Sequence, residues 1–186
     1  MEKFLAAYPP TPAVPVADEV LAHYRELLPV PLLSLWQHYG FGEFEGGLLR
    51  LIHPDTYRAA LETWLGGPKP HYTPIALSAF GDLFYYRRLT DSDEDVCLLD
   101  PHHGQISDCA WSLTDFFDAY LLDADVRESV LRQSLFVAAR QQLGPLLADE
   151  QYCFVPALAL GGAETVDFLS KGNAPVHLQL LFQLQG

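Results

Sequence analysis

Four strand-like segments follow one another between residues 73 and 110, with only tight turns or short loops between them. They are rich in leucine, aromatic and β-branched residues, which suit a pleated, half-buried sheet. The segments are residues 73–77, 82–87, 95–100 and 105–110. Their connections are too short to hold a crossover helix, so neighbouring segments are expected to pair in opposite directions. With a further short strand at 48–52, the sequence predicts an antiparallel β-meander of four or five strands.

Helical periodicity is found on both sides of this meander. Apolar residues recur at helical spacing in five segments, and prolines or glycines stand at most of their ends. The expected helices lie within residues 18–28, 31–39, 54–64, 112–121 and 125–142. A proline-rich stretch at 8–15 is expected to run extended across the surface. The predicted fold class is therefore α+β, a meander packed with several α-helices.

The last part of the chain changes character after Gly144-Pro145. Residues 146–162 are apolar and interrupted by proline, so we expect extended chain or loop packed on the main body. Residues 176–184 are amphipathic and fit either a helix or a strand. We therefore expect an α+β domain over residues 1–142 and a C-terminal module over residues 143–186, together forming one compact unit.

Negative charge is concentrated in one part of the sequence. The net charge is −13, and residues 89–126 contain many acidic side chains but no lysine or arginine. Such a field repels nucleic acids and anionic membranes, and it attracts a basic protein. A solvated face that keeps the protein soluble is the alternative. The candidate partner-binding residues are Asp91, Asp93, Glu94, Asp95, Asp100, Asp115 and Asp118.

Catalytic and metal-binding motifs are weak in this sequence. The best metal candidate combines Asp100, His102 and His103 with the nearby Cys97 and Cys109. Adjacent histidines in a turn usually point apart, so a polar hairpin tip is the favoured interpretation. His53 and Asp55 could form an acid–base pair, but a helix start explains them better. Asp115 and Asp118 lie on an exposed helix face, which gives no desolvation to separate their pKa values. We expect no enzymatic activity, metal or cofactor.

Cysteine and tryptophan usage adds two expectations. The three cysteines are an odd number without metal-type spacing, which favours reduced, buried thiols. Trp36, Trp64 and Trp111 each lie on the apolar side of their segment and are expected in or at the edge of the core. No secretory signal or membrane-spanning run is evident, so the protein is expected in the cytoplasm.

Several ordered phrases in the sequence resemble a known family. They are LP at 28–29, LWQHYG at 35–40, HPD with Tyr57 at 53–57, PIA at 74–76, AFGDLF at 79–84, LGPL at 143–146, and the segments 149–162 and 177–184. Together they resemble the GAD-like (GAD-related) domain family, in the form that carries the C-terminal module of Tdi-type immunity proteins from bacterial type VI secretion systems. The resemblance covers nearly the whole chain.

The resemblance implies a protein partner. Such immunity proteins bind and block a secreted antibacterial toxin, often a nuclease, inside the producing cell, and they are not enzymes. The acidic stretch fits a basic, phosphate-binding toxin that could be a DNase. A regulatory module with an endogenous partner is the alternative. A small enzyme or metal protein that uses Asp100, His102, His103 and Cys109 is a third possibility. The oligomeric state is left open.

Overall fold

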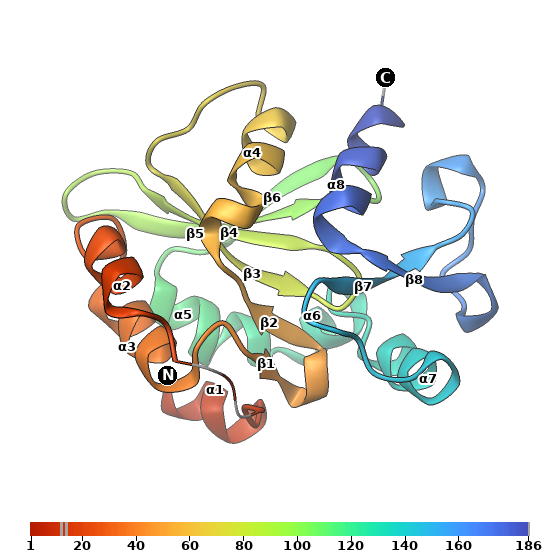
Figure 1. The fold of residues 1–186 in the computed structure, drawn as a ribbon, viewed down its shortest axis with the longest axis horizontal. Coiled ribbons are helices and arrows are strands. Elements are labelled where there is room, and N and C mark those ends of the chain that lie inside the picture. Colours follow the sequence, from red (N-terminus) through yellow and green to blue (C-terminus); the bar gives the residue numbers. More distant parts are fainter. Residues whose placement is uncertain (12, 14, 186) are drawn as a thin grey trace.

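The computed structural model describes residues 1–11, 13 and 15–185, and its main element is a six-stranded antiparallel sheet. The strands follow chain order, β1-β2-β3-β4-β5-β6, so the predicted meander is confirmed (Figure 1). Their bounds are β1 Glu43–Phe44, β2 Leu49–Leu51, β3 Tyr72–Ser78, β4 Leu83–Arg88, β5 Glu94–Asp100 and β6 Gln105–Ala110. The short β1 extends the meander beyond the expected five strands.

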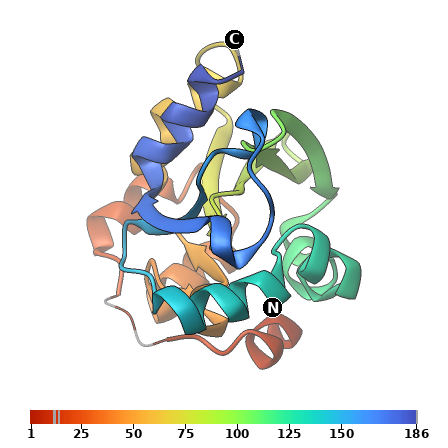
Figure 2. The same cartoon turned by 90° about the vertical axis from the view of Figure 1, so that its right-hand side faces the viewer.

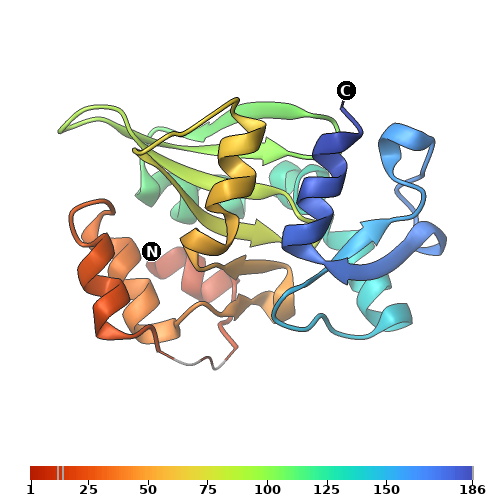
Figure 3. The same ribbon diagram turned by 45° about the horizontal axis from the view of Figure 1, so that its top comes forward.

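Helices cover both faces of this sheet. The helices are α1 Glu2–Ala7, α2 Asp18–Tyr24, α3 Val30–Tyr39, α4 Pro54–Trp64, α5 Leu113–Asp118, α6 Ala124–Ser129, α7 Gln133–Leu143 and α8 Ala174–Gln183. On one face α4 and α8 lie side by side (Figure 3). The N-terminal helices and α5 pack on the opposite face. The chain thus forms three layers, with the sheet in the middle.

The alternation of side chains along β4 explains why both faces are buried. Leu83 and Tyr85 point into the core beneath α4 and α8, whereas Phe84 and Tyr86 point into the larger core on the other side. All four are nearly inaccessible to solvent. A central strand that is apolar on both faces requires a covering layer on each.

Local capping chemistry sets two helix starts as the sequence predicted. The Ser112 hydroxyl accepts a hydrogen bond from the Asp115 backbone N–H (3.0 Å), which caps α5. His53 caps α4, where its Nδ1 accepts from the Asp55 backbone N–H (3.3 Å) and Pro54 occupies the first helical position. The interpretation of His53 and Asp55 as a helix start is confirmed.

The prediction of one continuous helix over residues 125–142 is wrong. It is divided into α6 and α7, because Arg132 adopts the left-handed conformation (φ 53°, ψ 48°) and cannot continue an α-helix. Periodicity alone did not reveal this break, since apolar residues occur at helical spacing on both sides of it.

Residues 146–162 were expected to be extended chain or loop, and the structure shows that part of this segment is a strand. β7 (Glu150–Phe154) lies within it and pairs antiparallel with β8 (Leu169–Asn173), forming a separate two-stranded sheet (Figure 2). Residues 176–184, left open between helix and strand, belong mainly to α8. Near the other terminus, Pro10 bridges to Phe44 as extended chain, while residues 12 and 14 of the proline-rich stretch lie outside the described residues.

The described helices include none that is long and apolar enough to cross a membrane.

Candidate functional site

The acidic residues expected to bind a partner fall into two groups, and four of them are tied to this chain's own groups. Asp95 is fully buried and accepts two hydrogen bonds from the guanidinium of Arg87, one of them from Nε at 2.7 Å. This bidentate pair compensates the Asp95 charge. The expectation that Asp95 belongs to an uncompensated surface is wrong, because Arg87 lies just before the acidic stretch and reaches it across the β4–β5 ladder.

Glu94 and Asp118 join elements of the fold. Glu94 accepts from the Tyr86 hydroxyl (2.8 Å) and from the Leu113 backbone N–H (3.0 Å), which fixes the start of α5 against β5. Asp118 accepts from the Phe4 backbone N–H at 3.1 Å and holds α1 against α5. Both side chains are partly buried. They therefore hold elements of the fold together, and little of either carboxylate is exposed to a partner.

Asp100 stabilises the turn between β5 and β6. Its Oδ1 accepts from the His102 backbone N–H (2.8 Å), and its Oδ2 lies 2.8 Å from Nδ1 of His103. Burial raises the pKa of Asp100, but the hydrogen bond from His103 and the nearby backbone N–H groups outweigh burial and bring the pKa below its usual value. This is the polar hairpin tip that the sequence suggested.

The remaining three candidates, Asp91, Asp93 and Asp115, are exposed. Asp91 and Asp93 lie in the β4–β5 loop, where Asp93 accepts from the Thr90 hydroxyl at 2.6 Å. Asp115 is in the first turn of α5. Asp108, which was not among the seven candidates, is also exposed and shares Arg87 with Asp95 (2.8 Å). These carboxylates form the acidic surface that the fold leaves accessible.

The edge strand β6 lies next to these exposed acids. Val96 pairs with Ala110, so the end of β6 lies at the start of β5, beside the β4–β5 loop. Trp111 follows directly and is 73% exposed, while Ile106 within β6 is 48% exposed. The expectation that Trp111 lies in or at the edge of the core is wrong, because its side chain is largely exposed at the end of the edge strand. Trp36 is buried and Trp64 partly buried, as expected.

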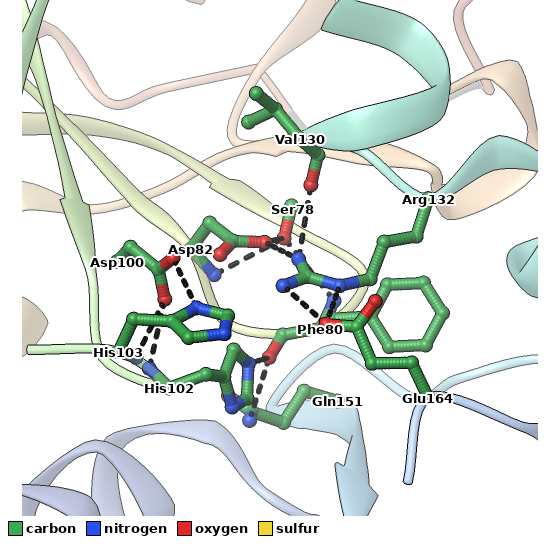
Figure 4. A network of polar contacts seen from close by, with 10 residues as sticks. All are labelled: Ser78, Phe80, Asp82, Asp100, His102, His103, Val130, Arg132, Gln151 and Glu164. Atoms are coloured by element: carbon green, nitrogen blue, oxygen red, sulfur yellow. Dashed lines mark hydrogen bonds and ion pairs between the residues drawn. The ribbon is translucent and has the colours of Figure 1, made fainter. Parts of the chain in front are cut away.

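A buried polar network joins the β3–β4 turn to the C-terminal part of the chain (Figure 4). Arg132 donates from Nη1 to Asp82 Oδ2 (3.0 Å) and to the Val130 carbonyl (3.0 Å), and from Nη2 to Glu164 Oε1 (3.1 Å). Its guanidinium also lies 5.9 Å from the centre of the Phe80 ring. Asp82 and Arg132 are both nearly inaccessible. The left-handed backbone at Arg132 thus directs its side chain inward to meet the β3–β4 turn.

The same network includes His102. Its Nε2 lies 2.8 Å from the Phe80 carbonyl, which Gln151 Nε2 also contacts at 3.2 Å. Because a carbonyl can only accept, Nε2 carries the proton and Nδ1 is left as a buried acceptor without a partner among the described residues. His102 therefore points inward and His103 outward, so the expectation that these histidines point apart is confirmed.

The burial of this ring contributes to the pH dependence of stability. Burial lowers the pKa of His102, so the unfolded chain binds a proton at a higher pH than the folded chain does. Below about pH 6.5, proton binding therefore stabilises the unfolded state more than the folded state. This lowers the free energy of unfolding by at most about 1.4 kcal/mol per pH unit for one histidine. We expect the free energy of unfolding to fall between pH 7.5 and pH 5, measured by urea titration.

His102→Gln is the matched variant for this measurement. Its amide can still donate to the Phe80 carbonyl but does not titrate, so the fall in stability should be smaller than in the unmodified protein. An equal fall in both proteins would assign the pH dependence to other groups.

The cysteines are all free thiols. Burial raises the pKa of Cys109 and of Cys153 to about 12, and it raises the pKa of Cys97 as well. Among the described residues, Cys97 with Asp95 and Asp108 forms a group with metal-ligand spacing, all ligand atoms within 4.8 Å of one another. Arg87 already pairs with both carboxylates there, and the thiol is held protonated. This chemistry does not suit a resident cation.

Sequence reasoning missed Trp111, Ile106, Arg87 and Arg132. One signal for the edge was available, since residues 105–110 lack the apolar alternation of the other strands, as expected for a strand exposed on both faces. No signal in the sequence indicated the left-handed conformation of Arg132.

The structure thus defines an acidic α+β protein with an exposed tryptophan beside the edge strand of its sheet. Comparison with known proteins identifies its family. A sequence model described as the GAD-like domain matches residues 1–97, just over half of the chain, and the chain belongs to this family. A second model, described as the C-terminal domain of the type VI secretion immunity protein Tdi1, matches residues 112–185. This match supports the assignment of the chain to the type VI immunity proteins.

A solved structure has the same fold. The crystal structure of Atu4351 from Agrobacterium tumefaciens resembles this chain with a TM-score of 0.74 and 18% sequence identity, over 98% of this chain and 88% of that one. At this identity the likeness concerns the fold alone. The search of curated proteins gave no match.

Proposed function

We propose that this protein binds and neutralises a cognate antibacterial toxin of a type VI secretion system in the cytoplasm of the producing cell, without catalysing a reaction. The observation that carries the proposal is the match of residues 112–185 to the immunity protein Tdi1. The match of residues 1–97 to the GAD-like domain supports it from the other end of the chain.

The exposed acidic surface favours a basic toxin, and a nuclease in particular. A nuclease carries positive charge around its phosphate-binding cleft, and exposed carboxylates can occupy or mask that cleft. Asp91, Asp93 and Asp115 are available for this purpose, since they have no arginine or lysine partner among the ion pairs of the described residues. Glu94, Asp95, Asp100 and Asp118 are mainly committed to the fold and contribute less.

The proposal is tested by co-expression with a candidate type VI toxin, sought among the genes that adjoin the gene for this chain. In a bacterial host, that protein alone should stop growth, and this chain should restore it and purify with it as a stable complex. Unchanged toxicity together with the absence of a complex would overturn the proposal and favour a regulatory role with an endogenous partner.

Charge reversal at the exposed acids should slow the formation of this complex. We expect Asp91→Lys with Asp115→Lys to lower the association rate constant by about tenfold at low salt, since steering by opposite charge raises association rates by ~10–10³. The difference should shrink as salt is added. Surface plasmon resonance at several salt concentrations measures this effect.

Asp167→Lys is the matched control for that measurement. Asp167 is an exposed acid in the segment between β7 and β8, far from the β4–β5 loop (Figure 1). It should change the association rate less than Asp91→Lys alone does, a single variant that alters the net charge by the same amount. Equal effects would show that net charge, and not this surface, guides the encounter.

A further inference from the structure

We propose that β6 is a docking strand, on whose free edge an extended basic segment of the partner toxin pairs, with Trp111 as the main side-chain anchor. This inference rests on the proposed function, because it assigns the surface through which the toxin is held. It is carried by the open edge, the exposed side chains along it and the charge around it.

The edge of β6 is open. Among the described residues, β6 is the last strand of the six-stranded sheet and pairs with β5 alone, with a register shift between Val96 and Cys97. An edge strand leaves alternate backbone N–H and C=O groups without a ladder partner, and proteins usually protect such an edge with lysine, proline or a covering element. β6, with the sequence QISDCA, has neither residue. Figure 3 shows it (green) along the upper border of the molecule with no strand beyond it.

The side chains on β6 specify the chemistry of the added strand. Ile106 pairs with Leu99, and Asp108 pairs with Cys97, so Ile106 and Asp108 point to the same side of the sheet. Both are exposed, and they are two residues apart. A strand laid beside β6 would therefore place an apolar side chain next to Ile106. Asp108 already has Arg87 as its counterion (2.8 Å), so basic side chains of the added segment would instead meet the acids of the β4–β5 loop and of α5 that form no ion pair within the described part of the chain.

Trp111 extends this surface at the end of β6. Tryptophan is one of the residue types enriched at the energetic centre of protein interfaces, and Trp111, at 73%, is more exposed than Phe168 (40%) and Phe182 (37%). Its neighbours are the β4–β5 loop, which carries Asp91 and Asp93, and the first turn of α5, which carries Asp115.

The negative charge near β6 favours pairing with a strand of the partner over pairing with a second copy of this chain. The exposed acids near β6 are Asp91, Asp93, Asp108 and Asp115, and the chain as a whole carries −13. Pairing two copies through β6 would bring these groups together, and like charges across an interface oppose association. A basic segment from the toxin would meet the same groups with favourable charge.

The position of β6 relative to the family matches fits a partner-specific role. The GAD-like match ends at residue 97 and the Tdi1 C-terminal match begins at residue 112. Residues 98–111, which contain the end of β5, the β5–β6 turn, β6 and Trp111, are covered by neither. The proposed docking strand thus lies in the segment that the shared family pattern leaves unspecified.

The inference is tested with the purified toxin that the co-expression experiment identifies, made inactive by mutation. Trp111→Ser should weaken the complex by about 30-fold, the loss typical of an anchor residue at an interface. Val30→Ser is the matched control, since Val30 is also 73% exposed but begins α3, and it should leave affinity unchanged. Both variants should unfold at the same denaturant concentration as the unmodified protein.

Hydrogen exchange supplies a second readout that does not depend on a variant. Alternate backbone amides of residues 105–110 point away from β5 and should exchange rapidly in the free chain. In the complex, these amides should become protected, as a newly paired strand requires.

The outcomes separate this inference from the proposed function. If the unmodified protein forms no complex, the proposed function fails. If it forms a complex that Trp111→Ser does not weaken and in which residues 105–110 gain no protection, the docking strand is overturned while the immunity function stands. Dimerisation of the free chain that Trp111→Ser abolishes would assign the edge to self-association and would also overturn the inference.

Discussion

Replacing Arg132 with methionine is expected to lower the free energy of unfolding by about 3–5 kcal/mol, the cost of leaving one partner of a buried ion pair uncompensated. Asp82 is only 1% exposed, and Arg132 Nη1 is its cationic partner at 3.0 Å. Methionine fills much of the arginine volume, so the expected loss comes from the stranded carboxylate and not from a cavity. Equilibrium unfolding in urea measures the change.

A second substitution separates charge from packing in this result. Combining Arg132→Met with Asp82→Asn removes the buried negative charge and should recover a substantial part of the loss, because residues in direct contact are not additive. Glu164→Gln is the matched control. Glu164 also pairs with Arg132 but is 44% exposed, so its loss should cost less than about 1 kcal/mol. A small effect of Arg132→Met alone would show that Asp82 is hydrated or protonated without its partner.

Phe80→Ala is expected to destabilise the fold by about 3–5 kcal/mol, the range for removing a fully buried phenylalanine. Phe80 lies in the β3–β4 turn with no solvent exposure. Its ring stacks on Phe154 of β7, with ring centres 5.8 Å apart, and also contacts Tyr152 and the Arg132 guanidinium. The substitution would open a cavity between the two sheets, so thermal and urea unfolding should both shift.

Two further variants define what this effect means. Phe80→Leu retains most of the apolar volume and should cost clearly less. Phe182→Ala removes the same side chain from α8, where it is 37% exposed, and should also cost less. If Phe80→Ala were as mild as Phe182→Ala, the contact between the β3–β4 turn and β7 would contribute little to stability. The two halves that the family matches define would then be energetically almost independent.

Much of the architecture could be predicted from local sequence. The β3–β6 segments have strand composition and are joined by connections too short for a crossover, so an antiparallel meander was the available topology. The start of α5 is encoded by Ser112 and the start of α4 by His53 and Pro54, because capping depends on residues only two or three positions apart. The phrases shared with the GAD-like family indicated the family directly.

The acidic site was only partly predictable from the sequence, because local patterns do not show which residues meet across neighbouring strands. Counting acids between residues 89 and 126 established the charge, but a count along the chain does not say which carboxylates meet a donor. Arg87 neutralises Asp95 from the neighbouring strand, and Tyr86 donates to Glu94 across the same ladder. These contacts depend on strand register, which places residues eight positions apart within hydrogen-bonding distance.

The sequence by itself determined the class of fold, the sign of the charge and the family of this protein, because these follow from composition, short-range periodicity and ordered motifs. Only the tertiary structure decided that Arg132 turns inward to Asp82, that β7 pairs with β8, and that Trp111 stays outside the core beside an open edge. Each of these outcomes depends on contacts between residues far apart in the chain, or on a backbone conformation held by such contacts. Local sequence preferences do not contain that information.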